Sequence, residues 1–185
     1  MIDDTLLEAE EKMEKTVAVA KEDFAGIRTG RANPGLFSKI MVDYYGTPTP
    51  INQLASFHVV DARMISITPY DKSQMAAVER AIRDSDLGVN PMDDGQIIRV
   101  ALPELTEERR REYVKVVKNM AEDGRIAVRS ARRDARKAME HAEKEGEISA
   151  DELERAEKEL EKVTHEHVEH IDAALGRKEQ ELLEV

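Results

Sequence analysis

Cysteine and tryptophan are absent from this chain of 185 residues, and only 4% of its residues are aromatic. The absence of cysteine excludes a disulfide framework, a thiolate nucleophile and a zinc site with cysteine ligands. The few aromatic side chains, together with 36% charged residues, favour long solvent-exposed helices over a deep globular core. The composition therefore predicts an elongated protein and removes several classes of enzyme from consideration.

Long apolar runs are also missing. No stretch approaches the length that spans a membrane, and the N-terminal residues Met1–Thr5 are acidic where an export signal would be basic. We therefore expect a soluble, cytoplasmic protein with no membrane partner. The net charge of −11 argues against binding of nucleic acid by the whole surface, so a phosphate-binding site requires a local concentration of cations.

Proline is confined to the middle of the chain, from Pro34 to Pro103, and both flanks are dense in Ala, Glu, Lys and Arg. In the first flank, apolar residues recur every three or four positions from Ile2 to Ile27, the period of a helix with one apolar face. In the second flank, Thr106 is a predicted N-cap of another helix. The apolar period continues through Gly124, so we predict one unbroken helix to about Ala142, on the order of 50 Å long.

A third helix is predicted after Gly146, because Ser149 and Glu152 have the spacing of a capping box. The apolar seam of the second helix is predicted to contain Tyr113, Val117, Met120, Gly124, Ala127, Ala131, Ala135, Ala138 and Ala142. The seam of the third is predicted to contain Leu153, Ala156, Leu160, Val163, His167, Ile171, Ala174 and Leu182. Narrow seams cannot bury a helix alone, so we expect a three-helix bundle.

The central stretch has the period of strands. Lys39–Tyr44, Arg63–Thr68 and Gln96–Leu102 are predicted as short β-branched strands, and Asp71 is predicted to cap a helix that continues through Ile82. The predicted fold class is α+β: an elongated three-helix bundle of residues 1–30 and 105–185 carries an inserted small β/α/β domain of residues 31–104. The two chain crossings are a predicted hinge. Its residues are Thr29, Gly30, Arg31, Pro103, Glu104 and Leu105.

The strongest chemical pattern is the segment Arg125–Lys137, in which six cations accompany one carboxylate. At 100° per residue, four of its arginines fall on one strip of the helix, with Arg133 beside it, and the strip is expected to face solvent. The strip contains Arg125, Arg129, Arg132 and Arg136. Two interpretations remain open: these arginines pair with carboxylates of neighbouring helices, or their planar forks bind RNA phosphates and stack on unpaired bases.

No other pattern predicts a site. The histidines of His165–His170 lack the spacing of a zinc-binding helix, and His167 lies on the predicted seam, so we assign no metal. The chain also has no phosphate-cradling glycine loop, no nucleophile elbow and no serine–histidine–acid set. We therefore predict no catalytic residue and no enzymatic activity.

Several stretches together resemble the ribosome recycling factor family over essentially the whole chain. They are Arg28–Pro34, Val42–Gly46, Ser85–Pro91, Leu102–Arg110 and the arginine-rich segment Arg125–Ala135. The resemblance implies an L-shaped molecule with a flexible elbow. It also implies that Arg132, with Arg129 and Arg133, holds large-subunit ribosomal RNA. Thr49–Pro50 and the histidine cluster are less typical of the family.

The resemblance further implies a function: after termination, the protein splits the ribosome into subunits together with elongation factor G. GTP would be used by that partner, so no cofactor is expected on this chain, and a monomer is expected. The alternative from the residues alone is a helical scaffold or holdase that acts through coiled-coil oligomerisation, with the arginines serving solubility.

Overall fold

The computed structural model describes residues 1–184, which divide into two compact units. The first unit contains Met1–Phe24 and Lys115–Glu179, and the second contains Ala25–Val114 and the residues from Gln180 onward. The chain therefore leaves the first unit after Phe24, returns to it at Lys115, and ends in the second unit. These boundaries differ from the predicted ones at residues 30/31 and 104/105. Within residues 1–184, every helix is too polar or too short to cross a lipid bilayer.

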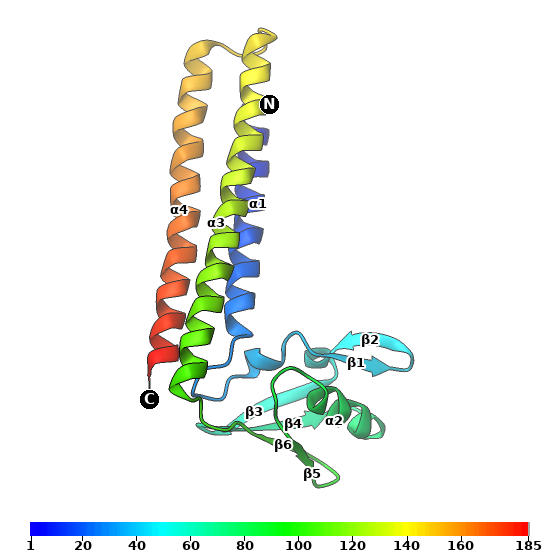
Figure 1. Cartoon of the computed structure of the whole chain (residues 1–185). Coiled ribbons are helices and arrows are strands. Elements are labelled where there is room, and N and C mark those ends of the chain that lie inside the picture. Colours follow the sequence, from blue (N-terminus) through cyan, green and yellow to red (C-terminus); the bar gives the residue numbers. More distant parts are fainter. Residues whose placement is uncertain (185) are drawn as a thin grey trace. The chain divides into compact units, whose positions relative to one another are not determined.

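The first unit is built from three long helices that run side by side (Figure 1). They are α1 (Ile2–Ala25), α3 (Glu107–Lys144) and α4 (Ala150–Leu183). The prediction of three helices is confirmed, and α3 is one helix of 38 residues that continues through Gly124. Glycine at position 124 suits close helix packing. A Cβ atom there would lie only 3.1 Å from Cδ1 of Ile171 on α4 and 3.6 Å from Cβ of Ala20 on α1. The missing side chain thus lets three helices approach one another.

The ends of α3 and α4 follow the predicted capping residues. The Thr106 hydroxyl accepts a hydrogen bond from the Arg109 N–H at 3.2 Å. Gly146 has a φ of +73° after the last turn of α3, a conformation that favours glycine. Ser149 and Glu152 form the reciprocal capping box: each side chain accepts from the backbone N–H of the other, at 3.1 Å and 2.7 Å. The turn between α3 and α4 is therefore determined by local chemistry.

The seams are confirmed for α1 and α4, including His167, which is 5% exposed. The predicted seam of α3 is wrong at Ala127 and Ala138, which are both exposed. Ala121, Val128 and Met139 are buried instead. Alanine is compatible with both the core and the solvent. In a helix with alanine on several faces, alanine positions alone therefore do not show which face is buried.

The second unit is an α/β structure around two antiparallel sheets. A hairpin pairs β1 (Met41–Tyr44) with β2 (Thr47–Pro50). A four-stranded sheet has the order β3-β4-β6-β5, and its strands are β3 (Ala55–Asp61), β4 (Met64–Pro69), β5 (Pro91–Asp93) and β6 (Ile98–Ala101). Helix α2 (Met75–Arg83) lies between β4 and β5 in the chain. The core of this unit includes Phe37, Ile65, Ile67, Val78, Ile82 and Ile98.

The predicted β/α/β domain is confirmed in outline and incomplete in detail. β1, β4 and β6 match the three predicted strands, whereas β2, β3 and β5 were not predicted. β2 contains two prolines and β5 begins with Pro91, and proline is confined to sheet edges and strand starts because it cannot donate to the ladder. β3 has exposed residues on both faces, so it lacks the alternation that predicts a strand. Asp71 is a cap, but of the short 3-10 turn Lys72–Gln74 that leads into α2.

Candidate nucleic-acid interface

The arginine-rich segment occupies the middle of α3 and contains both ion-paired and unpaired guanidinium groups. Val128 and Ala131 point into the bundle, which places Arg125, Arg132 and Arg136 on the flank next to α4. Arg129 and Arg133 lie farther round the helix, toward solvent. The segment therefore has two groups of arginines with different surroundings.

Arg125 is fully engaged by carboxylates. Its Nε donates to Oδ1 of Asp172 at 2.7 Å, its Nη2 lies 2.7 Å from the same oxygen, and its Nη1 donates to Glu122 at 2.9 Å. Its side chain is only 21% exposed. Partial burial opposes the charge, but the hydrogen bonds that Arg125 donates to Asp172 and Glu122 outweigh it and raise the pKa of Arg125. The prediction that Arg125 faces solvent is therefore wrong, because Asp172 of α4 lies beside it and its side chain is only 21% exposed.

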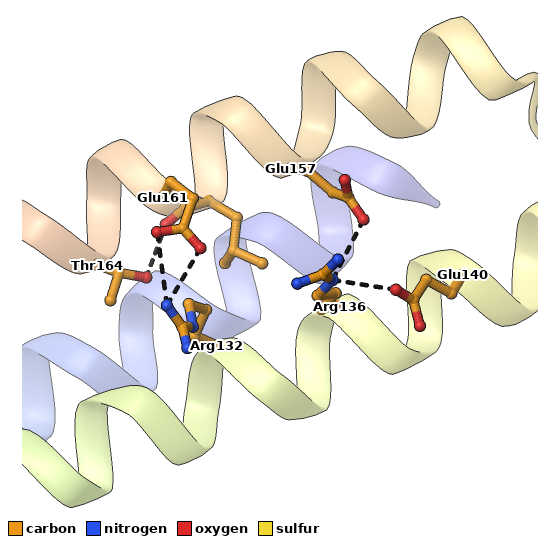
Figure 2. Close-up of polar contacts among 7 residues, drawn as sticks. Arg132, Arg136, Glu140, Glu157, Glu161 and Thr164 are labelled. Atoms are coloured by element: carbon orange, nitrogen blue, oxygen red, sulfur yellow. Dashed lines mark hydrogen bonds and ion pairs between the residues drawn. The ribbon is translucent and has the colours of Figure 1, made fainter.

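Arg132 and Arg136 are each held by one part of the guanidinium (Figure 2). Nη1 of Arg132 donates to both carboxylate oxygens of Glu161 on α4, at 3.2 and 3.5 Å. Nε of Arg136 donates to Glu140 at 3.0 Å and lies 3.3 Å from Oε1 of Glu157 on α4. The hydrogen bond to Glu140, followed by attraction to Glu157, raises the pKa of Arg136. Within the described residues, no hydrogen bond involves Nε or Nη2 of Arg132 or either Nη atom of Arg136.

The outward group consists of Arg129, Arg133 and Lys137. Arg129 has one distant ion pair, 3.9 Å from Nη1 to Glu122, and its side chain is 45% exposed. Arg133 and Lys137 are exposed, and neither has an ion pair with any residue in the part of the chain that the structure describes. These cations are available to a ligand such as a phosphate group. Lys137 was not predicted as a site residue, although it lies in the same cationic run.

The carboxylates of α4 also belong to this surface, and they were not predicted to be part of it. Arginines of α3 are contacted by three acids of α4: Glu157, Glu161 and Asp172. Glu161 and Asp172 lie 29 and 47 residues away in the chain from the arginines that they contact. The acidic composition of the third predicted helix was visible, but the register of two antiparallel helices was not. The interpretation that arginines of α3 pair with carboxylates of a neighbouring helix is therefore confirmed for Arg125, Arg132 and Arg136, and RNA binding stays a prediction.

The predicted hinge residues all lie in the second unit and make several contacts there. Thr29 is 8% exposed, and its hydroxyl accepts from the N–H of Arg31 at 3.3 Å. Glu104 pairs with Arg63 at 3.2 Å. The carbonyl of Leu105 accepts a hydrogen bond from Nε of Arg110 at 3.4 Å. Gly30 has no positive φ, and Pro103 is exposed. Their role as a hinge stays a prediction.

The histidine cluster is arranged along α4 without converging on one point. Nδ1 of His167 lies 2.7 Å from the Val163 carbonyl, His170 contacts the ring of His167 edge-on at 5.7 Å, and His165 pairs with Glu169 at 3.0 Å. Within residues 1–184, no group of three acidic, histidine or cysteine side chains is placed to hold a metal ion. His167 is accounted for as part of the bundle core.

Comparison with known proteins identifies the family. The profile of the family described as ribosome recycling factor matches residues 20–183, which is most of the chain and includes every arginine of the candidate interface. The chain belongs to the ribosome recycling factor family. Curated ribosome-recycling factors of Acidothermus cellulolyticus, Thermobifida fusca and Streptomyces coelicolor are 65%, 63% and 60% identical to it, each over 100% of both chains.

Solved structures agree with this assignment. A solution structure of a ribosome recycling factor is similar with a TM-score of 0.78 and 40% identity, over 100% of this chain and 98% of that one. The T. thermophilus ribosome recycling factor, placed with E. coli elongation factor G on the E. coli post-termination complex, is also 40% identical, with a TM-score of 0.71 and full coverage of both chains. The α+β, two-domain fold of the family is therefore the fold of this chain.

Proposed function

We propose that this protein is a cytoplasmic ribosome recycling factor that binds the post-termination ribosome and, with elongation factor G and GTP, splits it into subunits. Full-length identity of 58–65% to curated ribosome-recycling factors supports this, as does the relative placed with elongation factor G on a post-termination complex. The protein would act mechanically and not as an enzyme. GTP would be bound and hydrolysed by elongation factor G, so this chain would need no cofactor of its own.

The observation that carries the RNA-binding part of the proposal is the set of unpaired cationic groups on α3. In a protein of net charge −11, binding of ribosomal RNA requires a surface where cations are not neutralised by neighbours. Arg129, Arg133 and Lys137 provide such groups, and Arg132 and Arg136 add nitrogens that α4 leaves unoccupied. Arginine forks suit bidentate phosphate contacts. We propose that these five side chains bind large-subunit ribosomal RNA, and that Arg125 does not contact it.

The alternative, a scaffold that oligomerises through coiled coils, needs apolar seams that are free to pair between chains. In the described structure, the seams of α1, α3 and α4 are buried against one another within a single chain (Figure 1). The comparisons likewise support ribosome recycling and not the scaffold. We therefore expect a monomer, as the recycling function requires no second copy.

The direct test adds the protein to post-termination ribosomes with elongation factor G and GTP and follows subunit splitting by light scattering. Splitting is expected only when all three components are present. Binding to ribosomes without elongation factor G should weaken steeply with salt, since each phosphate contact contributes about one unit to the log–log slope. Absence of splitting, or an affinity that salt does not change, would contradict the proposal.

A further inference from the structure

We propose that Glu157 and Glu161 of α4 determine the RNA selectivity of this surface: they weaken its binding to RNA in general and leave its binding to the ribosome nearly unchanged. The inference rests on the proposed function, because it concerns the same arginines. It assigns a role to carboxylates that a simple cationic RNA-binding surface would not contain.

The geometry makes these two carboxylates competitors for phosphate. Glu161 occupies Nη1 of Arg132 through both of its oxygens, and Glu157 approaches Nε of Arg136 at 3.3 Å. The contacts drawn for the two arginines in Figure 2 involve one nitrogen of each guanidinium, and no hydrogen bond of the described residues involves the other nitrogens. A phosphate on those nitrogens would share a guanidinium with the carboxylate, so their separation would not exceed the Debye length of about 8 Å at physiological ionic strength. The carboxylates therefore repel a bound phosphate without blocking it.

This repulsion falls unequally on different RNAs. An RNA that reaches only the flank of α3 next to α4 meets Arg132 and Arg136, whose charges Glu161 and Glu157 offset. An RNA shaped to reach farther round α3 also contacts Arg129, Arg133 and Lys137. Arg133 and Lys137 have no ion-pair partner within residues 1–184, and Arg129 has only its distant contact with Glu122. Discrimination between partners commonly depends on such a repulsive element as well as on attraction. A ribosomal site that is anchored on Arg129, Arg133 and Lys137 approaches Arg132 and Arg136 from the side away from α4, where its phosphates lie farther from both acids. The acids of α4 thus penalise incidental RNA more than the ribosomal site.

The two acids are suited to this role by their position and exposure. The side chain of Glu161 is 60% exposed and that of Glu157 is 32% exposed, so neither is required as a buried counter-ion. Exposed ion pairs of this kind contribute little to folding stability, typically under about 1 kcal/mol. Asp172, by contrast, holds Arg125 through two nitrogens and is a structural partner. Removing the charge of Glu157 and Glu161 should therefore change RNA binding and leave the fold intact.

The experiment compares the double variant Glu157→Gln/Glu161→Gln with a matched control, Glu159→Gln/Glu166→Gln. Both control residues are exposed on α4, on the opposite flank at about 100° per residue, and have no ion pair with any residue of the described chain. The two variants carry the same net charge. Affinity is measured for a random-sequence RNA duplex and for post-termination ribosomes, at two salt concentrations, on the full-length protein.

We expect the double variant to bind the duplex at least about fivefold more tightly than the unmodified protein, and the ribosome within about twofold of it. The control should change neither affinity by more than about twofold. Equal gains in affinity for the duplex and the ribosome would overturn the proposed selectivity. Equal gains in duplex affinity for the control and the double variant would show that net charge alone is responsible. A loss of duplex affinity would show that the carboxylates position the arginines and do not repel phosphate. An unmodified protein that failed to bind ribosomes would instead contradict the proposed function, whatever the variants do.

Thermal unfolding of each variant, followed by circular dichroism, separates binding from folding. Gln keeps the size and the hydrogen-bond acceptor of Glu, so unchanged melting is expected. The single variants Glu157→Gln and Glu161→Gln should each give part of the gain in duplex affinity. A melting loss in the double variant, together with single variants that show no gain in duplex affinity, would count against the inference.

Discussion

Arg125 and Arg133 are the same residue type on the same helix, separated by about two turns, and the structure gives them opposite surroundings. Nε and Nη1 of Arg125 donate to Asp172 and Glu122, and its Nη2 is ion-paired with Asp172, whereas Arg133 is exposed and has no ion pair among the described residues. A cationic segment of a sequence can thus contain two kinds of side chain: those that form ion pairs between helices and those that remain available to a ligand. Which is which depends on the partner helix and not on the run itself.

Reversing the charge of Arg133 is expected to have the largest effect. Arg133→Glu removes a charge-assisted contact and adds repulsion toward phosphate, so we expect ribosome affinity to fall roughly 10- to 100-fold. Helicity and melting temperature should not change, because Arg133 holds nothing in place. The measurement is co-sedimentation with post-termination ribosomes at fixed salt.

Arg177→Glu is the matched control for this prediction. Arg177 is exposed on α4, in the same unit, and has no ion pair within residues 1–184, so the variant has the same change in net charge at a different place. Its affinity should stay within about twofold of the unmodified protein, since it lies away from the arginines of α3. A similar loss in both variants would mean that total charge, and not the face of α3, governs binding.

The next prediction concerns Gly124, on the buried face of α3 next to Arg125. Gly124→Val places a branched side chain where even a Cβ atom would be 3.1 Å from Cδ1 of Ile171, so the Ile171 side chain or the helices themselves must shift. We expect a loss of about 1–3 kcal/mol in the free energy of unfolding, measured by urea denaturation. A variant as stable as the unmodified protein would show that the close approach of the helices at Gly124 does not constrain the bundle.

Sequence patterns predicted the helical part of this fold well because its determinants are local. Thr106, Gly146 and Ser149 act within one turn of helix, and the period of apolar residues on α1 and α4 does not depend on the partner. The α/β unit was harder: β2 and β5 contain proline and pair at sheet edges, where a pattern suited to central strands does not apply. The phase of α3 was also ambiguous, since Ala127 and Ala138 are as compatible with a core as with solvent.

The candidate site was half predictable for a related reason. The concentration of arginines is a property of 13 adjacent residues and could be seen in the sequence. The pairing of Arg125 with Asp172 spans 47 residues, and it depends on the register between two antiparallel helices, which the turn at Gly146–Ser149 determines. Only a three-dimensional arrangement separates Arg125 from Arg133. The same register explains why the carboxylates of α4 were not assigned to the site.

Arg125 itself is expected to contribute to stability and not to RNA binding. Arg125→Ala removes two hydrogen bonds and the ion pair with Asp172 from a side chain that is 21% exposed, and we expect it to cost about 1–2 kcal/mol in urea denaturation. Arg136→Ala, which removes a 55% exposed side chain, should cost less than about 0.5 kcal/mol. Ribosome affinity should show the reverse order. If Arg125→Ala weakened ribosome binding more than Arg136→Ala, the division between joining and binding arginines would be wrong.

The smallest expected effect separates the geometry of the fork from its charge. Nε of Arg136 is held by Glu140 and lies beside Glu157, while no hydrogen bond of the described residues involves its two Nη atoms. Lysine has one ammonium group, which the same two carboxylates would bind, so Arg136→Lys keeps the charge but loses the group that extends past them. We expect a roughly two- to threefold loss of ribosome affinity and a shallower salt dependence, with unchanged melting. An affinity equal to that of the unmodified protein would show that charge alone acts at this position. It would contradict the idea that Arg136 contacts its acidic neighbours through Nε and a phosphate through its other nitrogens.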